Sequence, residues 1–240
     1  MIGQIFAICV SQAFAWYHSL VNMQPEIIFS IVVLVVSVIL HEVAHGYMAN
    51  YLGDPTARLA GRLTLNPIAH IDPIGSIILP ALLAILPALL AITGSPLLIG
   101  YAKPVPYNPY NLRGKFGETL VAASGPGTNL LLALLFALII RFGAVSMTAP
   151  MLGAFTIIVY VNLVLALFNL IPIPPLDGSK VLSGILPRAL AHKYDLFRVN
   201  FERLGILSGT LLVLVVFYLL LPYFSMLIKT IFFLLTGLRL

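Results

Sequence analysis

Long uncharged stretches recur along the chain and predict helices that cross a membrane. They fall at residues 27–40 (continuing through HEVAH at 41–45 to 52), 73–102, 119–140, 142–176 and 205–228. Because about 20 apolar residues span a bilayer, this pattern predicts an all-α polytopic membrane protein with about 5–6 transmembrane helices. Residues 2–17 are also uncharged but contain Gln4, Ser11 and Gln12, so both a short span and an interfacial helix remain open for them.

Residues 73–102 depart from the pattern of an ordinary span. Pro80, Pro87, Gly94 and Pro96 interrupt the stretch. Its length is short for two full crossings, and broken backbone is tolerated in a membrane where protein surrounds it. We therefore predict a re-entrant, proline-rich hairpin over about 74–100.

Residues 58–65 alternate partly between polar and apolar and are bounded by turn signals, which predicts a short β segment at the membrane surface. An open strand edge would hold an extended peptide substrate through backbone hydrogen bonds. Candidate substrate-binding residues here are Arg58, Gly61, Leu63 and Leu65. The alternative is a connecting loop with its arginines, Arg58 and Arg62, at lipid phosphates.

Composition agrees with a membrane location. Hydrophobic residues make up 60% of the chain and charged residues 9%, against about a quarter charged in soluble domains. The single cysteine, Cys9, excludes an internal disulfide framework and a cysteine-rich metal site. The net charge of +5 comes from scattered Lys and Arg without a basic run, so nucleic acid is not an expected partner and the lipid bilayer is.

The sequence His41-Glu42-Val43-Ala44-His45 is an HExxH motif inside an apolar stretch. On a helix, residues i and i+4 share one face, so both imidazoles can hold one Zn²⁺ while Glu42 acts as general base on the attacking water. Ionisable side chains at that depth in a membrane are costly and mark functional sites. The motif therefore predicts zinc-dependent hydrolysis.

A catalytic zinc usually has three protein ligands, and Asp177 is the candidate for the third. It ends an apolar stretch in the sequence Asn169-Leu-Ile-Pro-Ile-Pro-Pro-Leu-Asp177-Gly178, whose prolines prevent a continuous helix. We expect this unwound segment to present Asp177 to the metal and the Asn169 amide to the oxyanion of the substrate. The alternative is an exit loop in which Asp177 caps the following helix. His70 and Asp72 are a rival ligand pair.

Gly125-Pro126-Gly127-Thr128-Asn129 lies early in the stretch 119–140. Small residues allow close helix packing in membranes, and Asn129 is a candidate substrate-binding residue through a hydrogen bond near the site.

A shared metal constrains the topology. If Asp177 meets His41 and His45, both apolar stretches end near one face of the membrane, so their helices run parallel with one crossing between them. That arrangement puts most basic residues on the active-site face, which the positive-inside rule assigns to the cytoplasm. These residues are Arg58, Arg62, Lys103, Arg113, Lys115, Lys180, Arg188, Lys193, Arg198 and Arg203, with Arg141 on the opposite face.

Three motifs, HEVAH at 41–45, GPGTN at 125–129 and NLIPIPPLDG at 169–178, resemble the site-2 protease family of zinc intramembrane metalloproteases, in its compact prokaryotic form without a PDZ or CBS domain. The resemblance implies one Zn²⁺ held by His41, His45 and Asp177, with Glu42 as base. It implies transmembrane proteins or peptides as substrates and a multi-pass protein of the prokaryotic cell (inner) membrane. We expect a single domain over 1–240, with a catalytic core at about 27–52 and 118–178.

Two other functions are compatible with a metal site in a membrane. One is a non-proteolytic metal-binding protein or transporter, which would require carboxylates along a path through the membrane. The other is a hydrolase of small lipid-borne amides that uses the same zinc chemistry. The sequence carries no signal for the oligomeric state.

Overall fold

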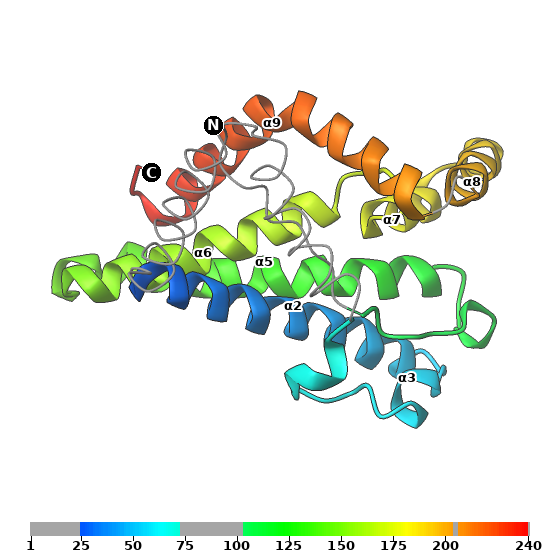
Figure 1. Cartoon of the computed structure of the whole chain (residues 1–240), viewed down its shortest axis with the longest axis horizontal. Coiled ribbons are helices and arrows are strands. Elements are labelled where there is room, and N and C mark those ends of the chain that lie inside the picture. Colours follow the sequence, from blue (N-terminus) through cyan, green and yellow to red (C-terminus); the bar gives the residue numbers. More distant parts are fainter. Residues whose placement is uncertain (1–24, 73–102, 204–205, 240) are drawn as a thin grey trace, which may run out of the picture.

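The computed structural model describes residues 25–72, 103–203 and 206–239, and their regular elements are all helices, with no strand among these residues (Figure 1). The helices are α2 (Pro25–Tyr51), α3 (Thr56–Leu59), α5 (Gly117–Gly143), α6 (Ala149–Asn169), α7 (Asp177–Ile185), α8 (Arg188–Glu202) and α9 (Ile206–Thr236). Short 3₁₀ turns are η1 (Pro67–His70), η3 (Pro109–Asn111) and η4 (Ala144–Ser146).

Four helical segments of the described chain are long and apolar enough to cross a membrane. They are Pro25–Tyr51, Gly117–Ser146, Ala149–Asn169 and Leu219–Thr236. The predicted helical membrane fold is therefore confirmed for the described residues. Residues 2–17 and the expected hairpin at 74–100 lie outside the described residues, so the total number of spans stays a prediction.

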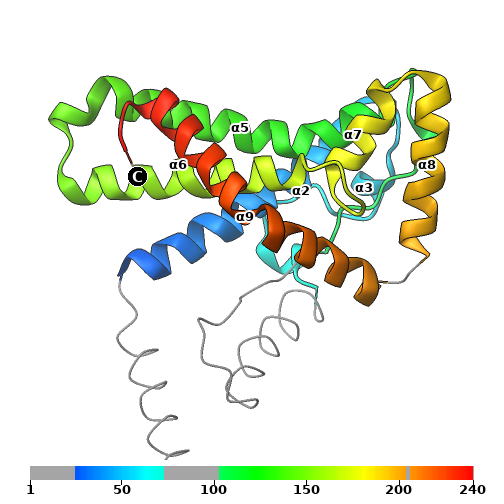
Figure 2. The ribbon, with the colours of Figure 1, turned by 90° about the horizontal axis from the view of Figure 1, so that it is seen from above.

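Three helices form the centre of the molecule (Figures 1 and 2). Helices α2 and α6 run in the same direction, α5 runs antiparallel to them, and each of the three contacts the other two. Helix α9 packs obliquely across α5 and α6, while α7 and α8 lie at the end of the bundle where α2 and α6 finish. The parallel relation of α2 and α6 is the one that a shared metal ligand set requires.

Small side chains on α5 bring the helices close together. Every fourth residue of α5 from Val121 is buried: Val121, Gly125, Asn129, Ala133 and Ala137. Residues four apart share a helix face, and in a membrane small residues on such a face let neighbouring backbones approach. Towards the other end of the bundle, Ala133 and Ala137 join Ile140, Val159, Leu163 and Phe232 in a buried apolar cluster of α5, α6 and α9.

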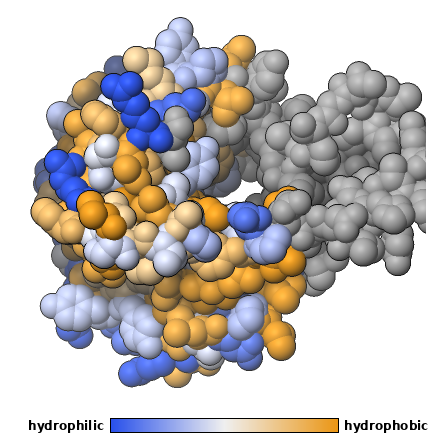
Figure 3. Space-filling model, turned by 90° about the vertical axis from the view of Figure 1, so that its left-hand side faces the viewer, coloured by the Kyte–Doolittle hydropathy of each residue, from blue (hydrophilic) through white to orange (hydrophobic). Residues whose placement is uncertain are grey.

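The outer surface is apolar, the reverse of a soluble helical bundle. Helix α2 alone exposes seven large apolar residues in its first half: Ile27, Ile28, Ile31, Val32, Leu34, Val35 and Val36. Figure 3 shows hydrophobic side chains over much of the visible described surface, with hydrophilic groups in separate patches. Such a surface needs lipid rather than water around it.

The predicted strand at 58–65 is wrong. Residues Thr56–Leu59 form the helical turn α3, and Gly61 follows in the left-handed region at φ 65°. Asp54 accepts hydrogen bonds from the backbone N–H and hydroxyl of Thr56, and the Arg62 N–H bonds back to the Ala57 carbonyl at 2.9 Å. Asp54-Pro55-Thr56 is thus a helix start and Gly61 a helix stop, and these local bonds outweigh the weak alternation.

The flanks of residues 73–102 lie at the same end of the bundle. The Lys103 N–H donates to the His70 carbonyl at 2.9 Å, and the Arg113 N–H donates to the Leu52 carbonyl at 2.8 Å. The chain therefore leaves and re-enters the described structure near the end of α2, as a re-entrant hairpin would require.

Candidate metal centre

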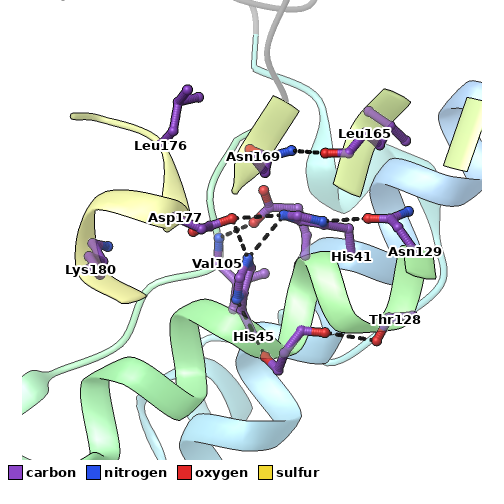
Figure 4. A network of polar contacts seen from close by, with 12 residues as sticks. His41, His45, Val105, Thr128, Asn129, Leu165, Asn169, Leu176, Asp177 and Lys180 are labelled. Atoms are coloured by element: carbon purple, nitrogen blue, oxygen red, sulfur yellow. Dashed lines mark hydrogen bonds and ion pairs between the residues drawn. The ribbon is translucent and has the colours of Figure 1, made fainter. Parts of the chain in front are cut away.

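Three potential metal ligands from α2 and α7 converge in the structure (Figure 4). The Nε2 atoms of His41 and His45 lie 3.1 Å apart, and Asp177 Oδ2 is 3.1 Å from the first and 3.3 Å from the second. Both histidines are buried and Asp177 is half-buried. Two nitrogens and one carboxylate oxygen in this arrangement match the donor set of catalytic zinc sites.

The proline-rich loop between α6 and α7 carries Asp177 to the histidines. Asp177 is the first residue of α7, which turns back toward the bundle after the loop. Gly178 packs so closely on this loop that a Cβ there would lie 2.2 Å from the Leu170 carbonyl oxygen. A glycine after Asp177 is thus required by the close approach of the two backbones.

Each histidine is oriented by a hydrogen bond from its second ring nitrogen. His41 Nδ1 lies 2.6 Å from the Asn129 amide oxygen, and His45 Nδ1 lies 2.7 Å from the Val121 carbonyl oxygen. Because both partners are acceptors, Nδ1 donates in each ring, and Nε2 faces Asp177, where it donates to the carboxylate in the absence of a metal and would otherwise bind the metal. Metal-binding histidines are held in this way, so the residues present fit a zinc ion.

A buried polar chain connects three helices behind His41. The Asn129 amide donates to Asn162 Oδ1 at 2.9 Å, and the Asn162 amide donates to the Ser37 hydroxyl at 3.0 Å. All three side chains are buried. Since buried amides are costly unless they are paired, these hydrogen bonds orient the Asn129 side chain so that its amide oxygen lies at His41.

The Asp177 carboxyl is kept ionised. Burial raises its pKa, but hydrogen bonds from His41 and His45 and their charge lower the pKa more, to well below the ordinary 3.8. A carboxylate is the form that binds a metal.

Beside the three ligand candidates lies a cavity of about 190 Å³. The Glu42 carboxylate lines it and accepts a hydrogen bond from the Val105 N–H at 2.9 Å. The other lining residues come from the segment 103–108 and from α5, α6, α7 and the loop before α7: Pro104, Val105, Tyr107, Val121, Ala122, Asn169, Pro175, Leu176 and Lys180, with His41, His45 and Asp177.

Tyr107 and Lys180 line the cavity but were not among the site residues predicted from the sequence. The Lys180 ammonium donates to the Tyr107 hydroxyl at 2.9 Å. Lys180 follows Asp177 by three residues, and i, i+3 positions share a helix face, so its spacing was a usable signal. Tyr107 had no such signal, because its place depends on the extended path of residues 103–108 past the end of α2.

The other predicted site residues are spread over several places. Asn169 lines the cavity, and its amide donates to the Leu165 carbonyl at 2.9 Å. Asn129 lies behind His41, outside the cavity lining. Arg58, Gly61 and Leu65 are exposed and Leu63 is half-buried, and none of the four lines this cavity of the described chain.

The rival ligand pair lies apart from the three ligand candidates. His70 is buried with Nε2 at 2.8 Å from the Thr64 carbonyl oxygen. Neither His70 nor Asp72 belongs to the ligand group that the described residues form. Arg62, expected at lipid phosphates in the loop alternative, is instead buried, and its guanidinium donates to the Ala69 carbonyl and, at 2.7 Å, to the Lys103 carbonyl.

Proteins with similar sequences bear names that agree with a zinc site at these residues. "Putative zinc metalloprotease YwhC" of Bacillus subtilis (strain 168) is 38% identical over 175 residues, which cover 69% of this chain and 72% of that protein. "Putative zinc metalloprotease Rip2" of Mycobacterium tuberculosis (strain ATCC 35801 / TMC 107 / Erdman) is 30% identical over 219 residues, 88% of this chain and 80% of that protein. No solved structure matches this chain significantly.

These relatives, the apolar helices and the three converging ligand candidates define a zinc metalloprotease of the membrane. The profile of peptidase family M50 matches residues 141–216, the part that carries α6, the proline-rich loop and Asp177. The chain belongs to peptidase family M50, the site-2 protease family, which confirms the resemblance of its motifs.

Proposed function

We propose that this protein is an intramembrane zinc endopeptidase that hydrolyses peptide bonds in or near transmembrane segments of other membrane proteins. The observation that carries the proposal is the position of His41, His45 and Asp177 at one end of a bundle of apolar helices whose outer surface is also apolar. A substrate that reaches this site has to be a membrane protein or a peptide that lies in the bilayer.

His41, His45 and Asp177 would hold the zinc ion, and the metal supplies a Lewis acid that polarises the reacting oxygen atoms. Glu42 takes one proton from a water molecule while the water oxygen forms a bond to the peptide carbonyl carbon, and the carbonyl π electrons move to its oxygen. Glu42 then gives that proton to the amide nitrogen as the C–N bond breaks and the carbonyl re-forms. The products are a carboxylic acid and an amine, which together account for one water, and the acid proton then passes to the amine to give a carboxylate and an ammonium group.

The Val105 N–H supports this role for Glu42, because it holds one carboxylate oxygen at 2.9 Å and so limits the side chain to a position in the cavity wall. Asn169 is proposed to act in catalysis as an amide donor to the oxyanion of the substrate. Its amide has two N–H groups, and the one bond to the Leu165 carbonyl leaves the second for a ligand in the cavity.

The whole chain, 1–240, is proposed to act as one membrane domain with its core at 27–52 and 118–178, in the cell membrane of a prokaryote. The cytoplasmic side is proposed for the active site because of the basic residues at that end of the bundle. Of these, Lys103, Arg113, Lys115 and Arg188 are exposed there.

The proposal is tested with purified protein in detergent and a peptide that contains one transmembrane segment. Wild type is expected to cleave it, and Glu42→Gln is expected to lose cleavage by about 10³-fold or more while it keeps about one zinc per chain, because Glu42 is not a ligand. His41→Ala and Asp177→Ala are expected to lose both zinc and cleavage. His70→Ala is the control and should keep both. Cleavage by Glu42→Gln at the wild-type rate, or full zinc in Asp177→Ala, would contradict the assignment.

A further inference from the structure

Tyr107 and Lys180 form a polar pair in the cavity wall that the mechanism above does not use. Tyr107 lies in the segment 103–108 and Lys180 lies in α7, so the pair joins the two parts of the chain that carry Val105 and Asp177. The Lys180 ammonium is 2.9 Å from the Tyr107 hydroxyl and 5.0 Å from the centre of its ring. Both side chains are half-buried.

The cavity is small enough that a bound peptide bond touches several walls at once. Its volume of about 190 Å³ lies below the roughly 300–1,000 Å³ of typical small-molecule pockets. Among the described residues that line it, Lys180 is the only lysine or arginine, and it lies one helical turn from Asp177 on the same face of α7. Tyr107 and Lys180 therefore line the same small cavity as Glu42 and the three ligand candidates.

Hydrogen-bond roles in the pair leave a donor for a substrate. An ammonium has no acceptor, so Lys180 donates and the Tyr107 oxygen accepts. The Tyr107 O–H can then donate to a second group. Because the Lys180 ammonium that donates to the Tyr107 oxygen is positively charged, it makes the Tyr107 O–H a stronger donor. Burial lowers the pKa of Lys180, but Tyr107, Asp177 and Glu118 raise it more.

We propose that the Tyr107 hydroxyl, polarised by Lys180, donates a hydrogen bond to the peptide oxygen as that oxygen becomes an oxyanion. The inference rests on the proposed endopeptidase activity and adds a donor to its site. Tyr107 is then a catalytic residue, because it touches the reacting oxygen, and Lys180 is a positioning residue that acts through Tyr107. No proton is transferred by the pair, so the balance of the hydrolytic step is unchanged.

The first test is the kinetics of Tyr107→Phe with the transmembrane peptide. This variant keeps the ring over Lys180 and removes only the hydroxyl. Because the donor acts on charge that develops in the transition state, we expect kcat to fall about 100-fold and KM to stay within about threefold. Lys180→Met should lower kcat by about 10-fold or more, and Lys180→Arg should recover most of it. Tyr110→Phe and Lys193→Met, both on exposed residues, are the controls and should match wild type.

A second measurement distinguishes this catalytic role from a purely structural role of the pair. It also distinguishes failure of this inference from failure of the proposed function. A phosphinic peptide, which imitates the tetrahedral state, should bind zinc-loaded Tyr107→Phe about 100-fold more weakly than wild type in calorimetry, with zinc content and melting temperature unchanged. Equal binding and equal kcat in Tyr107→Phe would overturn the inference even if Glu42→Gln is inactive.

Loss of zinc or of thermal stability in both Tyr107→Phe and Lys180→Met would also overturn the inference, since the pair would then only hold α7 to the segment 103–108. If wild type cleaves no transmembrane peptide, the proposed function fails, and the binding measurement still judges the pair.

Discussion

Gly125 of α5 lies directly against both histidines. A Cβ at this position would be 2.4 Å from His45 Nε2 and 2.7 Å from His41 Nε2, the two atoms that face Asp177. Apart from the backbone of its own helix, no atom of the described residues lies within 4 Å of the corresponding position at Gly127, two residues further along. The two glycines therefore differ in their surroundings while they share a helix and a residue type.

Gly125→Ala is expected to displace the imidazoles and to lower zinc affinity by about 10-fold or more, with an overpacking cost of about 1–3 kcal/mol. Gly127→Ala should keep zinc affinity and be at least as stable as wild type, because alanine is the better helix former. Zinc content after dialysis against a graded chelator measures the difference. Equal zinc retention in the two variants would mean that the histidines are not confined as described.

At the residue scale, the positions of His41, Glu42 and His45 could be predicted because their chemistry lies within one helical turn. Asp177 could be predicted because a zinc with two histidines lacks a ligand and few carboxylates end an apolar stretch. Asn129 was expected near the site, but its bond to His41 Nδ1 became visible only in the packed helices. Tyr107 reaches the cavity through a segment without periodicity, so no residue pattern could indicate it.

At the element scale, two buried groups hold the extended segment 103–108 in place, and the first is Arg62. Its guanidinium donates to the carbonyls of Ala69 and Lys103, which flank residues 73–102. Arg62→Ala leaves these carbonyls without their donor and should destabilise the protein by about 2 kcal/mol or more. The value of kcat should also fall, because Val105, which donates to Glu42, follows Lys103 in the same segment. Arg58→Ala, in the exposed turn α3, is the control. Similar melting temperatures and kcat values for the two variants would count against this role of Arg62.

The second buried group is Asp54, which accepts hydrogen bonds from the Asn108 N–H at 2.7 Å, the Asn111 amide at 2.9 Å and the Thr56 hydroxyl at 2.6 Å. Burial raises the pKa of Asp54, but these bonds lower it more, below the ordinary 3.8. A lowered pKa in the folded state means that the stabilisation is complete above the ordinary pKa and is lost as the pH falls below it.

Asp54→Asn should therefore be less stable than wild type at neutral pH, and the difference should shrink below about pH 4, where wild type loses its advantage. Melting temperatures measured between about pH 7 and pH 3 report this directly. A constant difference across that range would show that the charge of Asp54 is not what holds the segment.

The elements themselves could be predicted to different degrees. The spanning helices follow from apolar length, and α6 ends at Asn169 just before the prolines, as their chemistry requires. The segment 58–65 was mistaken for a strand because partial alternation was given more weight than the Asp54-Pro55 helix start. The contacts of Arg62 and Asp54 join parts of the chain that lie roughly 40–60 residues apart in sequence, and no local pattern reports such pairs.

At the scale of the whole molecule, the direction of each helix predicts which residues are accessible from which side. After replacement of Cys9, a cysteine at Lys115 or Arg188 should react with an impermeant thiol reagent from the cytoplasmic side, and one at Arg141 from the opposite side. All three positions are exposed, and Arg141 lies at the far end of α5 from Lys115. Labelling of all three from one side would contradict the arrangement of α5 across the membrane.

The relation of α2 to α6 could also be predicted from sequence, because two ligands of one metal have to end at a similar depth. The oblique packing of α9 over α5 and α6 could not be predicted, since apolar residues predominate along this helix and do not single out one face.

The central claim is that this site cuts peptide bonds at membrane depth with Glu42 as base. The most direct test is to reconstitute wild type and Glu42→Gln in liposomes with a protein that has one transmembrane segment, and to map the new termini by mass spectrometry. New termini are expected within or next to the apolar segment, present with wild type, absent with Glu42→Gln and abolished by a zinc chelator. New termini only in the soluble parts of the substrate, or the same termini with Glu42→Gln, would contradict it.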